Sequence, residues 1–166
     1  MTLYKFIRYV KFLWGSTNQH GVHSPFVYRY LTQCLYTPRN TTLSASEDVL
    51  VKSIAYFNYK HIALVQDDPE LRKRLLELCD DLVFAQLPLD VLFARAREST
   101  FTKIDAHQIH NGTLLVVADI YENKEAAQHW NALRGMEQAQ VTIDVFHCGL
   151  IFFRREQARQ HFKLRL

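Results

Sequence analysis

Two pairs of histidines are the first residues whose spacing could support chemistry. His20 and His23 form one HxxH pair, and His107 and His110 form another. Two imidazoles three residues apart can share one helix face and bind a metal ion. Neither pair has a nearby cysteine or a third ligand, so we predict no metal site and interpret all four as hydrogen-bonded turn residues. In their polar turn, His20 and His23 remain candidates for the edge of a catalytic pocket.

Five basic residues could bind an anion if the fold brought them together. Arg95, Arg97 and Lys103 follow a predicted strand, and Arg154 and Arg155 lie near the C-terminal end. Guanidinium groups suit the bidentate recognition of phosphate and carboxylate. The alternative is that these residues project into solvent from an irregular loop and a terminal face. The sequence therefore predicts either a small anionic ligand or a solvated surface.

The sequence lacks the motifs that are typical of a catalytic nucleophile or of a phosphate-binding loop. The sequence has no GxSxG elbow, P-loop or GxGxxG turn, and no glycine lies between Gly21 and Gly112. Cys34, Cys79 and Cys148 have leucine-rich or aromatic-rich neighbours, so we interpret them as buried structural thiols. Their odd number and wide spacing argue against disulfides and favour the reducing cytoplasm.

The composition is that of one folded domain. The chain has 166 residues, of which 48% are hydrophobic and 22% charged, and it is long enough to bury a core. A formal charge of +3 is too weak to imply nucleic-acid binding. No apolar run approaches the roughly 18 residues of a spanning helix, and no leader cleavage site is visible. We expect a helical N-terminal cap over residues 1–60 and an α/β core over 61–166.

The elements that must position these residues begin with a basic amphipathic helix over residues 3–14. Lys5, Arg8 and Lys11 repeat at every third position. The apolar side contains Leu3, Phe6, Ile7, Val10, Leu13 and Trp14. We expect this apolar side to dock onto its own domain. The alternative is a weak contact of residues 1–14 with an anionic membrane.

Strands and helices then alternate. Helical spacing continues over 26–36, and Ser44 with Glu47 forms a capping box for the next helix. Short apolar runs follow at 62–65, 82–85, 89–94 and 113–118, and the last of them comes after a predicted Asn111-Gly112 turn. Asp68 and Asn123 are predicted helix caps. With a hairpin over 141–153, the pattern predicts an α/β sheet covered on both faces.

The two ends of the chain carry longer motifs. One runs from Ser16 to Val27. The others are Asp119 to Tyr121, Trp130, Val141 to Asp144, Phe152 to Ala158 and His161 with Phe162. In order and spacing they resemble a family of class I S-adenosylmethionine-dependent methyltransferases found in Bacteroidetes. The resemblance covers about a third of the chain at each end. It implies a Rossmann-like sheet whose last two strands form an antiparallel hairpin.

The middle of the chain departs from the family's pattern. Such an enzyme needs a glycine-rich turn after its first strand, where backbone amides approach the cofactor closely. Residues 62–88 are also too few for all the expected elements, so we infer a fold shortened by about one strand-helix unit. By the resemblance, Gln66 stands in place of the acid that binds the cofactor ribose, and Asp67 and Asp68 are the neighbouring candidates.

The resemblance also indicates which residues of this chain stand at the family's catalytic positions. Arg95 to Arg97 stand where related enzymes have Asp-Gly-Asn, so basic groups replace an acid there. Asp119 falls where metal-dependent relatives place oxygen ligands, and it is the remaining catalytic candidate. A lone Asp119 with Glu122 nearby does not supply the several oxygen donors that a divalent cation needs.

These departures favour a catalytically degenerate methyltransferase homologue that binds no cofactor and acts as a binding or interaction protein. Two alternatives stay open. One is a small active methyltransferase that holds S-adenosylmethionine at the Val65 to Pro69 turn and uses Asp119 to orient its substrate. The other is a peripheral membrane protein held through its first helix. An unknown protein or a small anionic ligand is the expected partner, and an exposed strand edge could support a homodimer.

Overall fold

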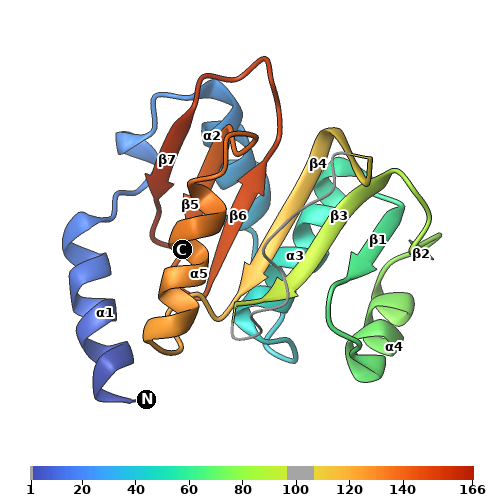
Figure 1. The fold of residues 1–166 in the computed structure, drawn as a ribbon, viewed down its shortest axis with the longest axis horizontal. Helices are drawn as coiled ribbons and strands as arrows, with labels where there is room; N and C mark the ends of the chain where they lie inside the picture. Colours follow the sequence, from blue (N-terminus) through green and yellow to red (C-terminus); the bar gives the residue numbers. More distant parts are fainter. Residues whose placement is uncertain (1, 97–106) are drawn as a thin grey trace.

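The structure is a computed structural model of the chain, in which residues 2–96 and 107–166 are described. A seven-stranded mixed sheet forms its centre and α-helices pack on both sides of it (Figure 1). The predicted α/β class is confirmed. The arrangement is compatible with a Rossmann-like fold.

Within the described residues, five α-helices form where the sequence provides an apolar face and an N-terminal cap. They are α1 (Leu3–Gly15), α2 (Pro25–Tyr30), α3 (Ala45–Phe57), α4 (Pro69–Leu78) and α5 (Lys124–Arg134). A 3-10 turn, η1 (Gln19–Gly21), precedes α2, and a π-helical turn, η2 (Leu31–Leu35), extends it. The predicted capping box is confirmed, because Ser44 accepts from the Glu47 amide while the Glu47 carboxylate accepts from the Ser44 amide. Asp68 and Asn123 cap α4 and α5 as predicted.

The strands of the described residues form one continuous sheet. They are β1 (His61–Leu64), β2 (Val83–Phe84), β3 (Leu89–Arg95), β4 (Ile109–Ala118), β5 (Val141–Asp144), β6 (Cys148–Phe152) and β7 (Gln160–Lys163). Their order is β2-β1-β3-β4-β6-β5-β7. The first four strands are parallel, β6 runs antiparallel between β4 and β5, and β7 is parallel to β5. The predicted C-terminal hairpin is confirmed as β5 and β6.

The predicted Asn111-Gly112 turn is wrong. Both residues lie inside β4, within an irregularity of its pairing with β3. The Thr113 hydroxyl donates to the Leu89 carbonyl at 2.6 Å and accepts from the His110 amide at 2.8 Å. These bonds stabilise a bulge, which lets the strand continue past a dipeptide that usually signals a turn.

Strand β7 was missed. Its residues belong to the basic C-terminal stretch, for which the sequence predicted a solvated face or an anion site and no strand. Gln160 and His161 are exposed, but Phe162 packs against the core and Leu164 is fully buried. Two apolar residues at alternate positions are a short signal, and the surrounding charges conceal it.

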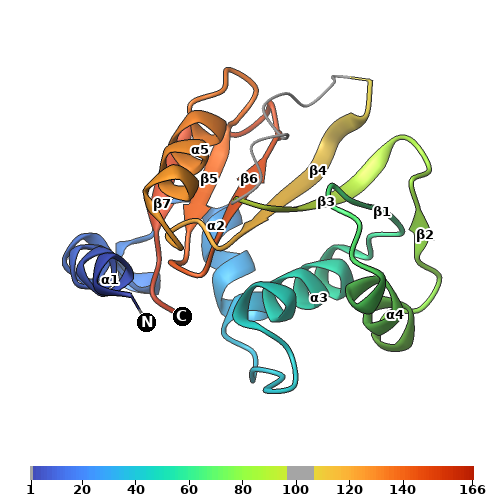
Figure 2. The same cartoon turned by 60° about the horizontal axis from the view of Figure 1, so that its bottom comes forward.

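Helices lie on both sides of the sheet (Figure 2). α2, α3 and α4 cover one face, α5 lies on the other, and α1 lies beside the β7 edge. The helices of residues 1–60 are thus divided, since Phe12 of α1 joins the apolar cluster on the α5 side while α2 and α3 pack into the opposite cluster.

α1 docks onto its own domain as predicted and Leu13 of its apolar side packs against the core, but the expectation that the whole apolar side docks is wrong. Phe12 is the buried residue of this helix, whereas Leu3 is 75% exposed and Trp14 is 87% exposed. The aromatic ring of Phe146 provides the reason, because Tyr9 and Phe12 pack against it at centroid distances of 4.9 and 5.5 Å. That contact turns the apolar stripe of the helix outward.

Trp130 of α5 packs directly on the backbone of β6. Its side chain is fully buried, and a Cβ atom added at Gly149 would lie 2.4 Å from two carbons of its ring. A side chain at this position would therefore push α5 away from the sheet. Trp130 and Phe152 both belong to the core, since both are fully buried.

We expect Gly149→Ala to lower the free energy of unfolding by roughly 1–3 kcal/mol, because the new methyl group overlaps the Trp130 ring. Urea unfolding measures this loss. Gly15→Ala is the matched control, since a methyl group there would meet only the Lys163 side chain, at 3.9 Å. Equal stability of the two variants would mean that α5 does not depend on this close approach.

Candidate functional site

The strand order reverses between β1 and β3, where open α/β sheets bind ligands outside the carboxyl ends of their strands. β2 lies on one side of β1, whereas β3 lies on the other side and pairs with β4. Gln66 and Asp68 follow β1, Arg95 ends β3 and Asp119 follows β4. The structure therefore brings these candidates to one edge of the sheet (Figure 1).

Arg95 connects the three loops at this edge. Its amide donates to Gln66 Oε1 at 2.8 Å, and its guanidinium donates to Asp68 Oδ2 at 2.8 Å. The guanidinium Nη1 also lies 3.6 Å from Asp119 Oδ2. We call Arg95, Gln66, Asp68 and Asp119 the Arg95 network. One cation faces two carboxylates in it, so the network carries a net negative charge.

Asp68 belongs both to the network and to α4. Its Oδ1 accepts from the Leu71 amide at 2.9 Å, while Oδ2 binds Arg95. The Leu71 hydrogen bond, followed by that of Arg95, holds the pKa of Asp68 below its ordinary value. A helix N-terminus attracts anions, and here the Asp68 carboxylate already occupies that end of α4.

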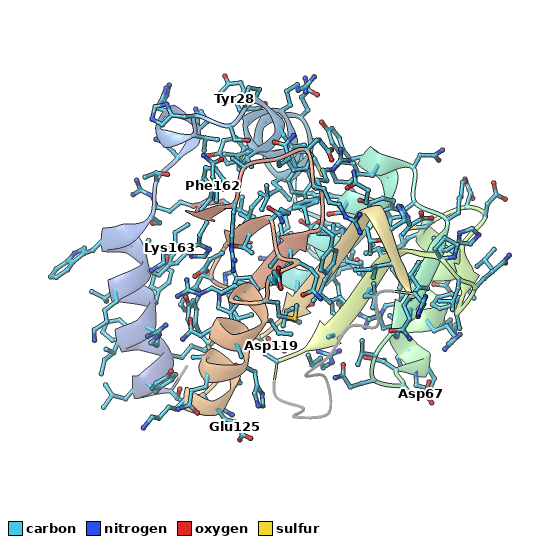
Figure 3. All side chains as sticks on the ribbon, turned by 45° about the horizontal axis from the view of Figure 1, so that its top comes forward. Tyr28, Asp67, Asp119, Glu125, Phe162 and Lys163 are labelled. Atoms are coloured by element: carbon cyan, nitrogen blue, oxygen red, sulfur yellow. The ribbon has the colours of Figure 1, made fainter. Side chains whose placement is uncertain are left out.

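Asp119 and Asp67 differ in their surroundings. Asp119 adopts a left-handed backbone conformation with φ of 59°, and its amide donates to the His147 carbonyl at 2.9 Å. Figure 3 shows Asp119 at the tip of β4 and Asp67 away from it, beside α4. Of the three predicted cofactor-binding residues, Gln66 and Asp68 contact Arg95. Asp67, which lies between them in the sequence, is exposed at the surface.

His20 and His23 lie apart from the Arg95 network. His20 is in η1, close after the bridge that joins Thr17 to Leu164 next to β7. The strands β5 and β6 separate β7 from β4, the strand that leads to Asp119. Both histidine side chains are exposed. The structure therefore does not combine His20 and His23 with Asp119 in one site.

The second histidine pair lies at the opposite end of β4. His110 Nε2 is 3.0 Å from Asp90 Oδ1, and Nδ1 accepts from the Gly112 amide at 3.0 Å. Both ring nitrogens are thus engaged, which confirms His110 as hydrogen-bonded, but it lies in β4 and not in the predicted turn. No group of three His, Cys, Asp or Glu side chains within residues 2–96 and 107–166 could hold a metal ion.

The basic residues predicted to bind an anion do not converge. Arg95 pairs with Ala118 at the carboxyl end of β4, whereas Arg154 and Arg155 follow β6, which runs in the opposite direction. The guanidinium of Arg154 lies over the ring of Phe26 at 4.7 Å. Arg95 and the two later arginines therefore lie at opposite edges of the sheet. The other two members of the predicted set, Arg97 and Lys103, lie outside the described residues.

Sequence reasoning missed a buried acid at the carboxyl edge. Asp144 ends β5 and is fully buried, and its carboxylate accepts from the Tyr121 hydroxyl and from the Phe146 amide. Burial raises the pKa of Asp144 above its ordinary value. The Arg8 guanidinium lies 4.4 Å from the centre of the Tyr121 ring, so this pair also supports α1. The sequence signal that could have identified Asp144 was an acid at the end of an apolar strand.

We expect Arg95→Ala to lower the free energy of unfolding by about 1 kcal/mol at neutral pH, because its ion pairs are partly exposed and solvent screens them. The pKa of Asp68 should rise but stay below its ordinary value, since the Leu71 amide remains. An NMR titration of the Asp68 carboxyl follows this change. Lys60→Ala removes the exposed Lys60–Asp81 pair and is the control, with an expected effect below about 0.5 kcal/mol.

The same variant should change the response to acid. A carboxyl group with a depressed folded pKa stabilises the protein above its unfolded pKa, and this contribution is lost as the pH falls through the folded pKa. The loss between neutral and acidic pH should therefore be smaller in Arg95→Ala than in the wild type. An unchanged Asp68 pKa in Arg95→Ala would contradict the network.

For Asp144 we expect the opposite pH dependence of the free energy of unfolding. Its raised folded pKa means that its contribution is greatest below the unfolded pKa, roughly pH 4, and is lost as the pH rises through the folded pKa. Asp144→Asn keeps an acceptor for the Phe146 amide and removes the charge. We expect the variant to gain stability relative to the wild type as the pH rises through this window.

Urea unfolding over a pH series measures the Asp144 effect. Asp81→Asn is the control, because the Asp81 side chain is 82% exposed and should leave the difference from the wild type nearly constant. If the Asp144→Asn and wild-type curves were parallel over the same range, burial of this charge would not be the cause.

Comparisons of the chain with protein families, with curated proteins and with solved structures found no match. The geometry of the site is therefore the main guide to function, and the methyltransferase resemblance of the two ends stays a prediction.

Proposed function

We propose that this chain is a shortened, catalytically degenerate homologue of S-adenosylmethionine-dependent methyltransferases that acts as a binding or interaction protein. The observation that carries the proposal is the position of Arg95 between Asp68 and Asp119. These three side chains meet where the strand order reverses, and there they bind one another. The charged groups of Arg95, Asp68 and Asp119 therefore already have partners, whereas Gln66 Nε2 is buried without a partner among the described residues.

The loop between β1 and α4 supports the same proposal. A nucleotide-type cofactor is commonly held by a glycine turn that opens onto a helix N-terminus. Residues 65–69 contain no glycine, and the Asp68 carboxylate caps the helix that follows. A ligand carboxylate would have to displace this cap and would meet the negative charge of Asp68.

The charge of the carboxyl edge favours a protein partner there over a small anion. Asp67 is exposed beside the Arg95 network, whose two carboxylates already exceed its single guanidinium. An added anion would therefore be repelled. A surface with basic side chains is the complementary partner for this edge.

The edges of the sheet give a homodimer little support. β2 is only two residues long, and Thr17 bridges to Leu164 next to β7. Short or covered edges limit pairing with a second copy. The three cysteines are free thiols, which is in keeping with the cytoplasmic location that we propose.

Calorimetric titration with S-adenosylmethionine and S-adenosylhomocysteine, with and without magnesium, tests the proposal. We expect no saturable heat from the wild type, because the Arg95 network and the cap of α4 lie where a Rossmann-like sheet commonly binds its cofactor. Circular dichroism and urea unfolding establish that the titrated sample is folded. Saturable binding of either ligand would overturn the proposal in favour of a small active methyltransferase.

Arg95→Ala separates the two obstacles to cofactor binding. If the Arg95 ion pairs alone closed the site, this variant would bind S-adenosylmethionine. We expect it not to bind, because the loop after β1 still lacks glycine and Asp68 still caps α4. Binding by Arg95→Ala but not by the wild type would show that the cofactor site persists behind the ion pairs, which would overturn a complete loss of the site.

A further inference from the structure

α1 packs on the protein through the side that carries most of its charges. Lys5 forms an ion pair with Glu122, and the Arg8 guanidinium lies over the Tyr121 ring. On the same side, Phe12 is buried against Phe146. Two of the three basic residues of the helix are therefore engaged inward, and its orientation is set by specific contacts.

The opposite side of α1 is apolar and exposed. Its outer stripe consists of Leu3, Phe6, Ile7 and Trp14, which are 75%, 49%, 45% and 87% exposed. Their spacing of three, four and seven residues places them along one face of the helix. Four large apolar side chains on one exposed helical face are unusual unless that face binds something.

The charged side chains of α1 itself all have one sign. The first 46 residues contain no aspartate or glutamate. Lys11 is exposed on α1, and the Lys163 side chain lies next to Gly15 at the end of the helix. Arg165 is exposed and its amide donates to the Thr17 carbonyl at 3.0 Å. Figure 3 shows Lys163 beside α1. Cations thus flank the stripe.

We propose that α1 binds an anionic phospholipid surface, with its outer stripe in the apolar layer and Lys11, Lys163 and Arg165 at the headgroups. An interfacial helix needs an apolar face with bulky residues such as Trp, Phe and Leu, flanked by Lys or Arg. The described residues contain no helix that is long and apolar enough to cross a membrane. With 13 residues, α1 would lie in the plane of the surface.

A lipid surface fits this face better than a second copy of the chain. Two outer stripes packed together would bring the flanking cations of both copies close to one another, with no acid in α1 to compensate them. Anionic headgroups instead complement these cations, at about 1 kcal/mol for each basic residue near the surface. The inference is independent of the proposed function, because it rests on α1 and not on the Arg95 network.

Tryptophan fluorescence of the intact protein tests the inference directly. The chain has two tryptophans, of which Trp14 is 87% exposed and Trp130 is fully buried. A change in emission on adding vesicles therefore reports on Trp14. We expect a blue shift and flotation with vesicles of phosphatidylcholine mixed with an equal amount of phosphatidylglycerol. Pure phosphatidylcholine should bind more weakly, and added salt should weaken binding to the mixed vesicles.

A matched pair of double variants locates the binding face. Leu3→Glu with Ile7→Glu alters the outer stripe at exposed positions, and we expect vesicle binding to weaken by about tenfold or more. The control is Leu76→Glu with Leu78→Glu on α4, where the two side chains are 54% and 47% exposed. The control should bind vesicles like the wild type. Circular dichroism verifies that all variants are folded.

Three results would overturn the inference. The first is a wild type that neither floats nor changes its emission with anionic vesicles. The second is equal flotation of the two double variants. The third is a concentration-dependent dimer, seen by sedimentation and abolished by Leu3→Glu with Ile7→Glu, in a protein that binds no vesicles. None of these results bears on the calorimetric test of cofactor binding, so the two proposals fail separately.

Discussion

The pairing of β3 with β4 is the constraint on which the rest of the structure depends. Alternate residues of both strands enter opposite apolar clusters, as Phe93 and Leu92 do on β3. Burying each large apolar side chain contributes roughly 1.5–3 kcal/mol. A strand pair that is apolar on both faces requires cover on both faces, which α3 and α4 provide on one side and α5 on the other (Figure 2).

The register of the same pair also creates the Arg95 network. Arg95 pairs with Ala118, so the residue that ends β3 lies beside the start of the loop that contains Asp119. β1 pairs with β3 on the other side and leads to Gln66 and Asp68. The ion pairs thus follow from strand alignment, and they lie at the position where a Rossmann-like sheet commonly binds its ligand.

Signals that act over a few residues allowed much of the fold to be predicted. The caps at Ser44, Asp68 and Asn123 form as expected, because a side chain and an amide three residues away need no distant partner. The parallel strands were also recognisable as apolar runs. The bulge at Asn111 was not, because it depends on Thr113 meeting a carbonyl of β3.

The site was predicted only in part for the same reason. Asp68 and Asp119 were singled out correctly as neighbours of strand ends, but for Arg95 the sequence left open an anion site shared with Arg154 and Arg155 or a solvated loop. The hairpin of β5 and β6 was predicted, but its placement in the sheet was not: β6 pairs with β4 and carries those two arginines to the other edge. Likewise, the amphipathic pattern of α1 reveals a stripe but not which side of the helix is covered, and Phe146 decides that.

The contacts of α1 also determine when this helix is covered during synthesis and folding. Phe12 packs against Phe146, and Thr17 pairs with Leu164. A growing chain makes these partners long after α1 itself, and contacts between residues so distant in sequence close late. Until then both sides of α1 are uncovered. The nascent chain therefore displays Phe12 in addition to the outer stripe, and chaperones or membranes can meet the helix first.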